Sequence, residues 1–294
     1  MAVFSRIFFV LRAHPPGELP APPELSSRPR FRHPALSERP VPYTQVNGVR
    51  LHVQELGAPG RHPTAVLLHG LLVDNLSSWY FTAAPRLARE RRVVLYDLRG
   101  HGKSERAPAG YDTASLAADL GRLVAGLDAG PVDLVGHSYG ALVALRYARE
   151  HPEHVRRLAL VEAPLPPSRF GELEAWLDAE PEQLLAALPE GLRAGIESGG
   201  RRARRALAAL GFLLGESSLV ADLKAEADVP DAELARLALP VLLVYGRSSS
   251  CRGVGERLER ALPDARRVEL DGGHYLHLER PAELAASLEA FLDG

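Results

Sequence analysis

The chain has 294 residues, of which 46% are hydrophobic and 24% are charged, a composition typical of globular proteins. Its formal net charge of -2 provides no overall basic field, which argues against nucleic acid as a partner. A single cysteine, Cys251, excludes an intramolecular disulfide and a cysteine-rich metal site, and it favours a cytoplasmic location. No apolar run reaches the roughly 20 residues that a membrane helix requires, so we expect no transmembrane segment.

Residues 1–42 form a proline-rich arm in our interpretation. Nine prolines lie in this segment, and their spacing is incompatible with a continuous helix or an interior strand. The apolar stretch at its start contains Arg6 and is too short for the core of a signal peptide, so we expect no secretion signal. We expect a loosely ordered arm; the alternative is an apolar tip that covers a pocket, a neighbouring subunit or a membrane surface.

From residue 43 onward, short apolar runs alternate with helical patterns. The runs predict strands at 49–53, 64–68, 92–96, 132–135, 158–161, 241–245 and 265–270. Apolar residues at helical spacing predict helices over 113–127, 139–149 and 281–292. Apolar strands separated by helices are typical of an α/β architecture, in which helices cover both faces of a parallel sheet.

The strand pattern is absent between Pro164 and Pro240. This stretch is rich in Leu, Ala, Glu and Arg, and its helical pattern is interrupted at Pro181, Pro189 and Gly199. A helical block between two strands of one sheet predicts a cap rather than a second domain. We therefore expect one domain over 43–294, with a cap insertion over about 165–238.

Gly136-His137-Ser138-Tyr139-Gly140 matches the G-x-S-x-G pattern and lies between a predicted strand and a predicted helix. A nucleophile on such a sharp turn takes strained dihedral angles, and the flanking glycines let the neighbouring backbones pass. The turn also aims the N-terminus of the helix at the reacting atom. We predict that Ser138 is a nucleophile; a merely structural tight turn is the alternative.

A serine nucleophile needs a general base, and His274 is the leading candidate. It follows Asp271-Gly272-Gly273 in a glycine-rich loop after the last predicted strand, so it reaches the sheet edge where Ser138 lies. His277 is the alternative base. The backbone N–H groups of Leu71, in the turn His69-Gly70-Leu71, and of Tyr139 are predicted to form the oxyanion hole.

Together these motifs resemble those of the α/β-hydrolase superfamily. The resemblance covers about residues 43–294 in the expected order, and it is carried by His69-Gly70, Tyr96-Asp97-Leu98-Arg99-Gly100-His101-Gly102-Lys103-Ser104, Gly136–Gly140, Gly272-Gly273-His274 and Glu279-Arg280-Pro281. It implies the α/β-hydrolase fold: a mostly parallel eight-stranded sheet with helices on both faces, a helical cap after the sixth strand, and no cofactor. It also implies a structural rather than a catalytic role for Asp97.

The chain departs from this family where most members carry the acid of a catalytic triad. The family pattern is Gly-x-x-Asp, but this chain reads Gly246-Arg247-Ser248-Ser249, with no acidic residue from 246 to 255. We predict that Glu162, at the end of the strand over 158–161, supplies the acid, because strand ends on this edge converge. Burying an unpaired carboxylate at a strand end would also cost free energy, which favours pairing of Glu162 with the histidine. Certain haloalkane dehalogenases and polyketide-chain thioesterases resemble this arrangement. Asp271, Asp264, or no acid at all are the alternatives.

Three further residues are predicted to contact the substrate: Trp79, His137 and Tyr275. Core packing explains Trp79 equally well, and His137 points away from the nucleophile in a turn of this kind. We find no metal-ligand spacing and no phosphate-binding glycine loop, so we predict no metal site.

The predicted function is a serine hydrolase that cleaves an acyl ester or thioester through an acyl-enzyme. Analogy favours a thioesterase releasing a polyketide or fatty acyl chain. The substrate is then a small molecule or a carrier-bound acyl group, and an acyl carrier protein could dock on the basic cluster of Arg201, Arg202, Arg204 and Arg205. For that cluster we favour the simpler interpretation, a solvated helix face. The alternatives are C–C bond hydrolysis, acyl transfer or cyclisation, and a non-catalytic protein that binds an apolar ligand.

Overall fold

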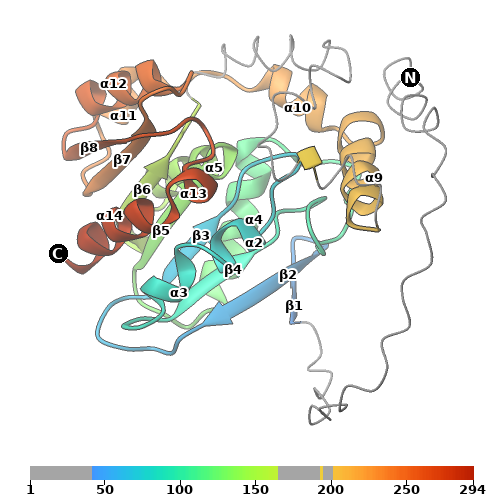
Figure 1. Cartoon of the computed structure of the whole chain (residues 1–294), viewed down its shortest axis with the longest axis horizontal. Helices are drawn as coiled ribbons and strands as arrows, with labels where there is room; N and C mark the ends of the chain where they lie inside the picture. Colours follow the sequence, from blue (N-terminus) through green and yellow to red (C-terminus); the bar gives the residue numbers. More distant parts are fainter. Residues whose placement is uncertain (1–41, 165–192, 195–200) are drawn as a thin grey trace, which may run out of the picture.

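The computed structural model describes residues 42–164, 193–194 and 201–294 (Figure 1). The proline-rich arm, except for its last residue, lies outside the described residues. So does most of the stretch expected to form the cap, residues 165–192 and 195–200.

Eight strands form one sheet in the order β1-β2-β4-β3-β5-β6-β7-β8. The β1/β2 and β2/β4 pairs are antiparallel and all others are parallel. Each predicted apolar run is a strand, and only β1 was not predicted as a separate run. The strands are β1(Tyr43–Val46), β2(Val49–Leu56), β3(Ala65–Leu68), β4(Val93–Tyr96), β5(Val132–His137), β6(Val155–Val161), β7(Val241–Gly246) and β8(Ala265–Leu270).

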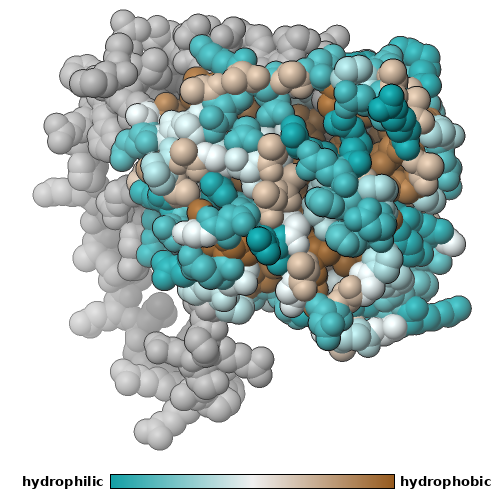
Figure 2. All heavy atoms as spheres, turned by 180° about the vertical axis from the view of Figure 1, so that it is seen from behind, coloured by the Kyte–Doolittle hydropathy of each residue, from teal (hydrophilic) through white to brown (hydrophobic). Residues whose placement is uncertain are grey.

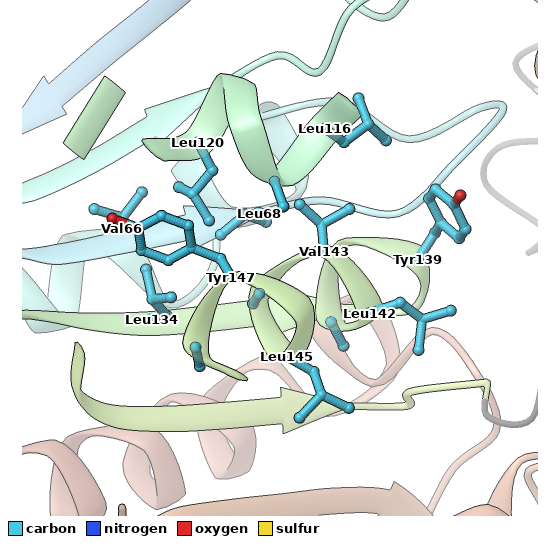
Figure 3. Close-up of a cluster of buried hydrophobic side chains, with 14 of the residues drawn as sticks. Val66, Leu68, Leu116, Leu120, Leu134, Tyr139, Leu142, Val143, Leu145 and Tyr147 are labelled. Atoms are coloured by element: carbon cyan, nitrogen blue, oxygen red, sulfur yellow. The ribbon is translucent and has the colours of Figure 1, made fainter. Parts of the chain in front are cut away.

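Helices cover both faces of this sheet, as the apolar strands predict (Figure 1). α4(Thr113–Ala125), α5(Tyr139–Glu150) and α12(Arg252–Ala261) share one core with alternate strand residues such as Val66 and Leu134. Figure 3 shows leucines of α4 and α5 meeting these strand residues. The other face is covered by α2(Ser77–Tyr80), α3(Ala84–Leu87), α13(Leu276–Glu279) and α14(Pro281–Asp293), which pack on the intervening residues such as Leu67 and Val135. Burial on both faces holds the central strands rigid, so their carboxyl ends are fixed platforms for side chains.

The chain between β6 and β7 contains the described helices α9(Arg201–Gly215), α10(Leu219–Ala225) and α11(Asp231–Leu234). Leu213 and Leu219 are fully buried in the core shared with α4 and α5. The backbone N–H of Ser218 donates to the Pro108 carbonyl, and the Asp222 carboxylate accepts from the N–H of Tyr111 at 2.8 Å. α9 and α10 therefore pack on the segment that follows β4. The short helix η1(Pro152–His154) connects α5 to β6.

The face seen in Figure 2 is mostly hydrophilic, with smaller hydrophobic areas between the hydrophilic residues. Among the described residues, no single helix has both the length and the apolar character needed to cross a membrane. One pair of helices, Arg205–Gly215 and Leu219–Ala225, meets those criteria only when taken together across a 52° bend.

Candidate active site

Three side chains predicted from the sequence meet at the carboxyl edge of the sheet. Ser138 follows β5, Glu162 follows β6, and His274 lies in the loop after β8. The Nε2 atom of His274 is 3.0 Å from Ser138 Oγ, and its Nδ1 atom is 3.2 Å from Glu162 Oε2. With the ring proton on Nδ1, the imidazole donates to the carboxylate and its Nε2 lone pair faces the serine hydroxyl.

Ser138 sits on a strained turn between β5 and α5, with φ 51° and ψ −123°. Added Cβ atoms would collide with the Gly140 carbonyl at Gly136 and with the His69 carbonyl at Gly140. Both glycines of the motif are therefore required by close backbone contacts. The strain holds the hydroxyl clear of the sheet at the start of α5.

The Glu162 carboxylate is completely buried and held by two donors besides the histidine. The backbone N–H of Gly246, at the end of β7, donates to its Oε1 atom, and the Ser249 hydroxyl donates to Oε2. Ser249 stands at the position where the Gly-x-x-Asp pattern places its aspartate. Ser249 thus has no carboxylate of its own, but its hydroxyl binds the carboxylate of Glu162, which follows the neighbouring strand β6. Glu162 also has a positive φ of 56°, which marks a constrained backbone at this site.

The alternative acids lie elsewhere. Asp271 forms an exposed ion pair with Arg247. Asp264 directly precedes β8, so it lies at the opposite end of the parallel strands, where its carbonyl accepts from the N–H of Val241. The structure therefore places Glu162, and neither aspartate, at Nδ1 of His274.

The His274 loop is clamped by a carboxylate. Glu279 accepts hydrogen bonds from the N–H of Gly273 at 2.7 Å and from that of Tyr275 at 3.3 Å, on either side of the histidine. Burial lowers the pKa of the His274 imidazole, but its contacts with Cys251 and Glu162 outweigh that effect and raise the pKa above its ordinary value. A raised pKa fits a group that must accept a proton during a reaction.

The turn at Leu71 is fixed on both sides. The N–H of Gly70 donates to Asp74 Oδ2 at 2.8 Å, and that of Leu72 donates to His101 Nε2 at 3.0 Å. Within the described part of the chain, no acceptor engages the N–H of Leu71. Tyr139 is the first residue of α5, so its N–H lies at the helix N-terminus. These are the two groups predicted to bind an oxyanion.

His137 is not placed to touch a substrate, contrary to the expectation from the sequence. Its ring is 1% exposed and lies between Asp74 Oδ2, at 3.3 Å from Nδ1, and the carbonyl of His274, at 2.9 Å from Nε2. It thus joins the turn at Leu71 to the loop of the candidate base. Burial alone would raise the pKa of Asp74, but its hydrogen bond to His137 holds that pKa well below the ordinary value. The sequence analysis missed Asp74, although an acidic residue so close after the His69-Gly70 turn was a usable signal.

Trp79 is part of the core and not of a pocket wall. It is 0% exposed, and its indole N–H donates to the Leu68 carbonyl at 2.9 Å. The prediction of substrate contact is therefore corrected in favour of the packing alternative, since a buried indole needs such a partner. Tyr275 is partly exposed beside His274, with ring centroids 5.4 Å apart, so it remains a candidate for substrate contact.

Two groups of side chains at this site carry the donor types of a metal centre. They are Asp74 with His137 and His277, and Glu162 with Cys251 and His274. In the first group, the Asp74 oxygens already accept from Gly70, Asn75 and Ser78. The second group includes the candidate base, His274, so a cation bound there would contact the base directly.

Comparisons with known proteins agree with the fold described above. A family model described as the alpha/beta hydrolase fold matches residues 63–195. An uncharacterized protein of Mycobacterium tuberculosis is 34% identical over 139 residues, which are 47% of this chain and 40% of that protein. The chain thus matches well under half the length of that curated relative.

Two solved structures match most of the chain. The enol-lactonase from Burkholderia xenovorans LB400 has a TM-score of 0.66 at 25% identity, covering 86% of this chain and 100% of its own. The thioesterase domain from the curacin biosynthetic pathway has a TM-score of 0.62 at 27% identity, covering 84% of this chain and 97% of its own.

Proposed function

We propose that the chain, as a member of the α/β-hydrolase superfamily, is a hydrolase, and within that class a serine hydrolase that cleaves acyl esters or thioesters. The observation that carries this proposal is the continuous contact from Ser138 Oγ through the two ring nitrogens of His274 to Glu162. A neutral imidazole in this position can take the hydroxyl proton, and the buried carboxylate stabilises the imidazolium that results.

In the first half of the proposed reaction, Ser138 Oγ attacks the carbonyl carbon of the substrate while its proton moves to His274 Nε2. The negative charge that develops on the carbonyl oxygen is stabilised by the N–H groups of Leu71 and Tyr139. As the tetrahedral intermediate collapses, the imidazolium returns its proton to the departing alcohol or thiol. An acyl group then remains on Ser138.

In the second half, a water molecule takes the place of the leaving group. His274 accepts a proton from the water, which attacks the acyl carbon, and the same oxyanion site stabilises the second tetrahedral intermediate. Collapse returns the proton to Ser138 and releases a carboxylic acid.

Within this class, we propose a thioesterase acting on a polyketide or fatty acyl chain. The similarity to the curacin thioesterase domain and the carboxylate at the end of β6 support this choice over a small ester. An acyl carrier protein as partner stays a prediction. Of the arginines expected to receive it, only Arg205 has a described side chain, and it is exposed.

A fluorophosphonate probe tests the nucleophile, because it labels only a serine activated by its base. We expect labelling of the wild-type chain and none of the Ser138→Ala variant. A folded wild-type chain that takes no label would favour the non-catalytic, ligand-binding alternative. Rates with acyl-carrier thioesters and with p-nitrophenyl esters then compare the substrate classes. A preference for the simple esters would contradict the thioesterase assignment and leave the serine hydrolase intact.

A further inference from the structure

Three side chains of different chemistry surround one atom, the Nδ1 nitrogen of His274. Glu162 Oε2 lies 3.2 Å from it, and Cys251 Sγ lies 3.8 Å from it. The ligand atoms of all three residues lie within 4.8 Å of one another. Apart from its contribution to the raised pKa of His274, Cys251 has no part in the proposed reaction, which therefore does not explain the presence of a thiol beside the base.

The two separations from His274 Nδ1 are close to the edges of a zinc tetrahedron. Zinc binds sulfur at about 2.3 Å and nitrogen or oxygen at about 2.0–2.2 Å, so tetrahedral ligands stand about 3.6 Å apart for sulfur and nitrogen and about 3.4 Å apart for nitrogen and oxygen. The contacts to His274 Nδ1 differ from these values by only a few tenths of an ångström. Binding therefore requires little change in these two separations, and the Cys251 and Glu162 ligand atoms, which lie within 4.8 Å of each other, would stand about 3.6 Å apart.

The donor set also suits the charge of the cation. Cysteine, histidine and carboxylate are the ligands that zinc prefers, and a thiolate with a carboxylate balances two positive charges. The N–H of Gly246 holds Oε1 of Glu162, and Oε2 accepts from the Ser249 hydroxyl with one lone pair and faces His274 with the other. The His274 side chain is 29% exposed and Cys251 is partly exposed, so a cation can enter from solvent.

We propose that Glu162, Cys251 and His274 bind a zinc-class divalent cation, and that this cation inhibits the enzyme. The inhibition rests on the proposed serine hydrolase function; the binding does not. The site would make the enzyme sensitive to free zinc.

The inhibition follows from the position of one proton. A cation on Nδ1 takes the lone pair of that nitrogen, so the ring proton moves from Nδ1 to Nε2. Nε2–H then faces Ser138 and cannot accept its proton. The thiol of Cys251 releases its own proton to solvent on binding, so each bound cation releases one proton in total. Removing the cation with a chelator reverses both changes.

Binding can be measured without any substrate, because Cys251 is the only cysteine in the chain. With Co²⁺ as probe, we expect a sulfur-to-cobalt charge-transfer absorption in the wild-type chain and none in Cys251→Ala. With Zn²⁺, we expect slower modification of Cys251 by a chromogenic disulfide reagent. The matched control is His151→Asn with His154→Asn, which removes the exposed group formed with Glu153. This control should keep both signals.

Turnover provides the second measurement. With each rate taken relative to the same protein without metal, we expect Cys251→Ala to need at least about tenfold more Zn²⁺ for half-inhibition, since even changes to residues that only support the ligands cost metal sites roughly 10–100-fold in affinity. If the alanine variant is unfolded, Cys251→Ser replaces it. Absence of the cobalt band, or equal Zn²⁺ sensitivity of the wild type and the variant, would overturn the proposal. A cobalt band in a chain that takes no fluorophosphonate would instead overturn the proposed function and keep the metal site.

Discussion

The Glu162 carboxylate reaches His274 across the end of an intervening strand. Glu162 follows β6, His274 follows β8, and β7 lies between these strands, yet Oε2 and Nδ1 are 3.2 Å apart. The carboxylate accepts hydrogen bonds from the Gly246 N–H at the end of β7 and from the Ser249 hydroxyl. The carboxylate that faces the base therefore comes from one strand and its supporting donors from the next.

Replacing Glu162 with glutamine tests whether this carboxylate supports catalysis. The substitution keeps the shape but removes the charge that stabilises the imidazolium, so we expect kcat to fall by about 10²- to 10⁴-fold. Thermal unfolding of the variant verifies that the fold persists. A turnover close to the wild-type value in folded protein would exclude Glu162 as the acid of the triad.

A second carboxylate position can be tested at Ser249, which contacts Glu162 and stands where the family pattern has aspartate. We expect the double variant Glu162→Gln with Ser249→Asp to have a kcat at least about tenfold higher than Glu162→Gln alone, because the aspartate returns a negative charge to the neighbourhood of His274 Nδ1. The control is Ser249→Asn in the same background, which has the same size without the charge. Equal activities of these two double variants would show that charge at this position does not help the base.

The pH dependence of kcat/KM reports the protonation of His274. The imidazole must be neutral to accept a proton, and its pKa is raised, so activity should fall as the pH drops through a value above the ordinary 6.5. Glu162→Gln removes an anion that favours the imidazolium, so the acidic limb of the remaining activity should move to lower pH. An acidic limb at the same pH in both proteins would show that Glu162 does not influence the pKa of the group that titrates.

His137 is a positioning residue in our interpretation, and kinetic constants distinguish this role from substrate contact. Replacing it with leucine removes the link between Asp74 and the His274 carbonyl. We expect kcat to fall by about tenfold with KM little changed, because the oxyanion turn and the base lose their mutual alignment. His137→Gln, which can still reach Asp74, should lose less. A rise in KM at unchanged kcat would point to substrate binding instead.

The buried imidazole of His277 should make the folded protein less stable in acid. Its ring is 1% exposed, its Nδ1 has no hydrogen-bond partner, and burial lowers its pKa to about 3. The unfolded chain takes up this proton near pH 6.5 and the folded one does not. The free energy of unfolding should therefore decrease by up to about 1.4 kcal/mol per pH unit as the pH falls from about 6.5 towards 3.

His277→Phe removes the titrating group but keeps a ring to pack against His137 and Trp79. Denaturant unfolding between pH 4 and pH 8 should show a shallower loss for this variant than for the wild type. Parallel pH profiles would mean that His277 does not contribute to acid unfolding.

Local sequence patterns were sufficient to predict the helices and strands and most of the candidate site. Apolar runs and helical spacing located the strands and the helices over 113–127, 139–149 and 281–292, whose observed ends differ by at most two residues. The turn at Ser138 and the glycine-rich loop before His274 were recognisable because turn chemistry is local. The absence of an acidic residue after β7 was also visible in the sequence alone.

Only the tertiary structure decided which side chains meet. Glu162 and His274 are 112 residues apart, so their contact depends on strand order and on the backbone at two loop ends. Trp79 was equally compatible with a core and with a pocket until packing placed its indole N–H on Leu68. The positions of His137 and Cys251 around His274 likewise follow from the meeting of separate loops. Local patterns specify turns and faces, whereas contacts between distant segments depend on packing that no short stretch of sequence contains.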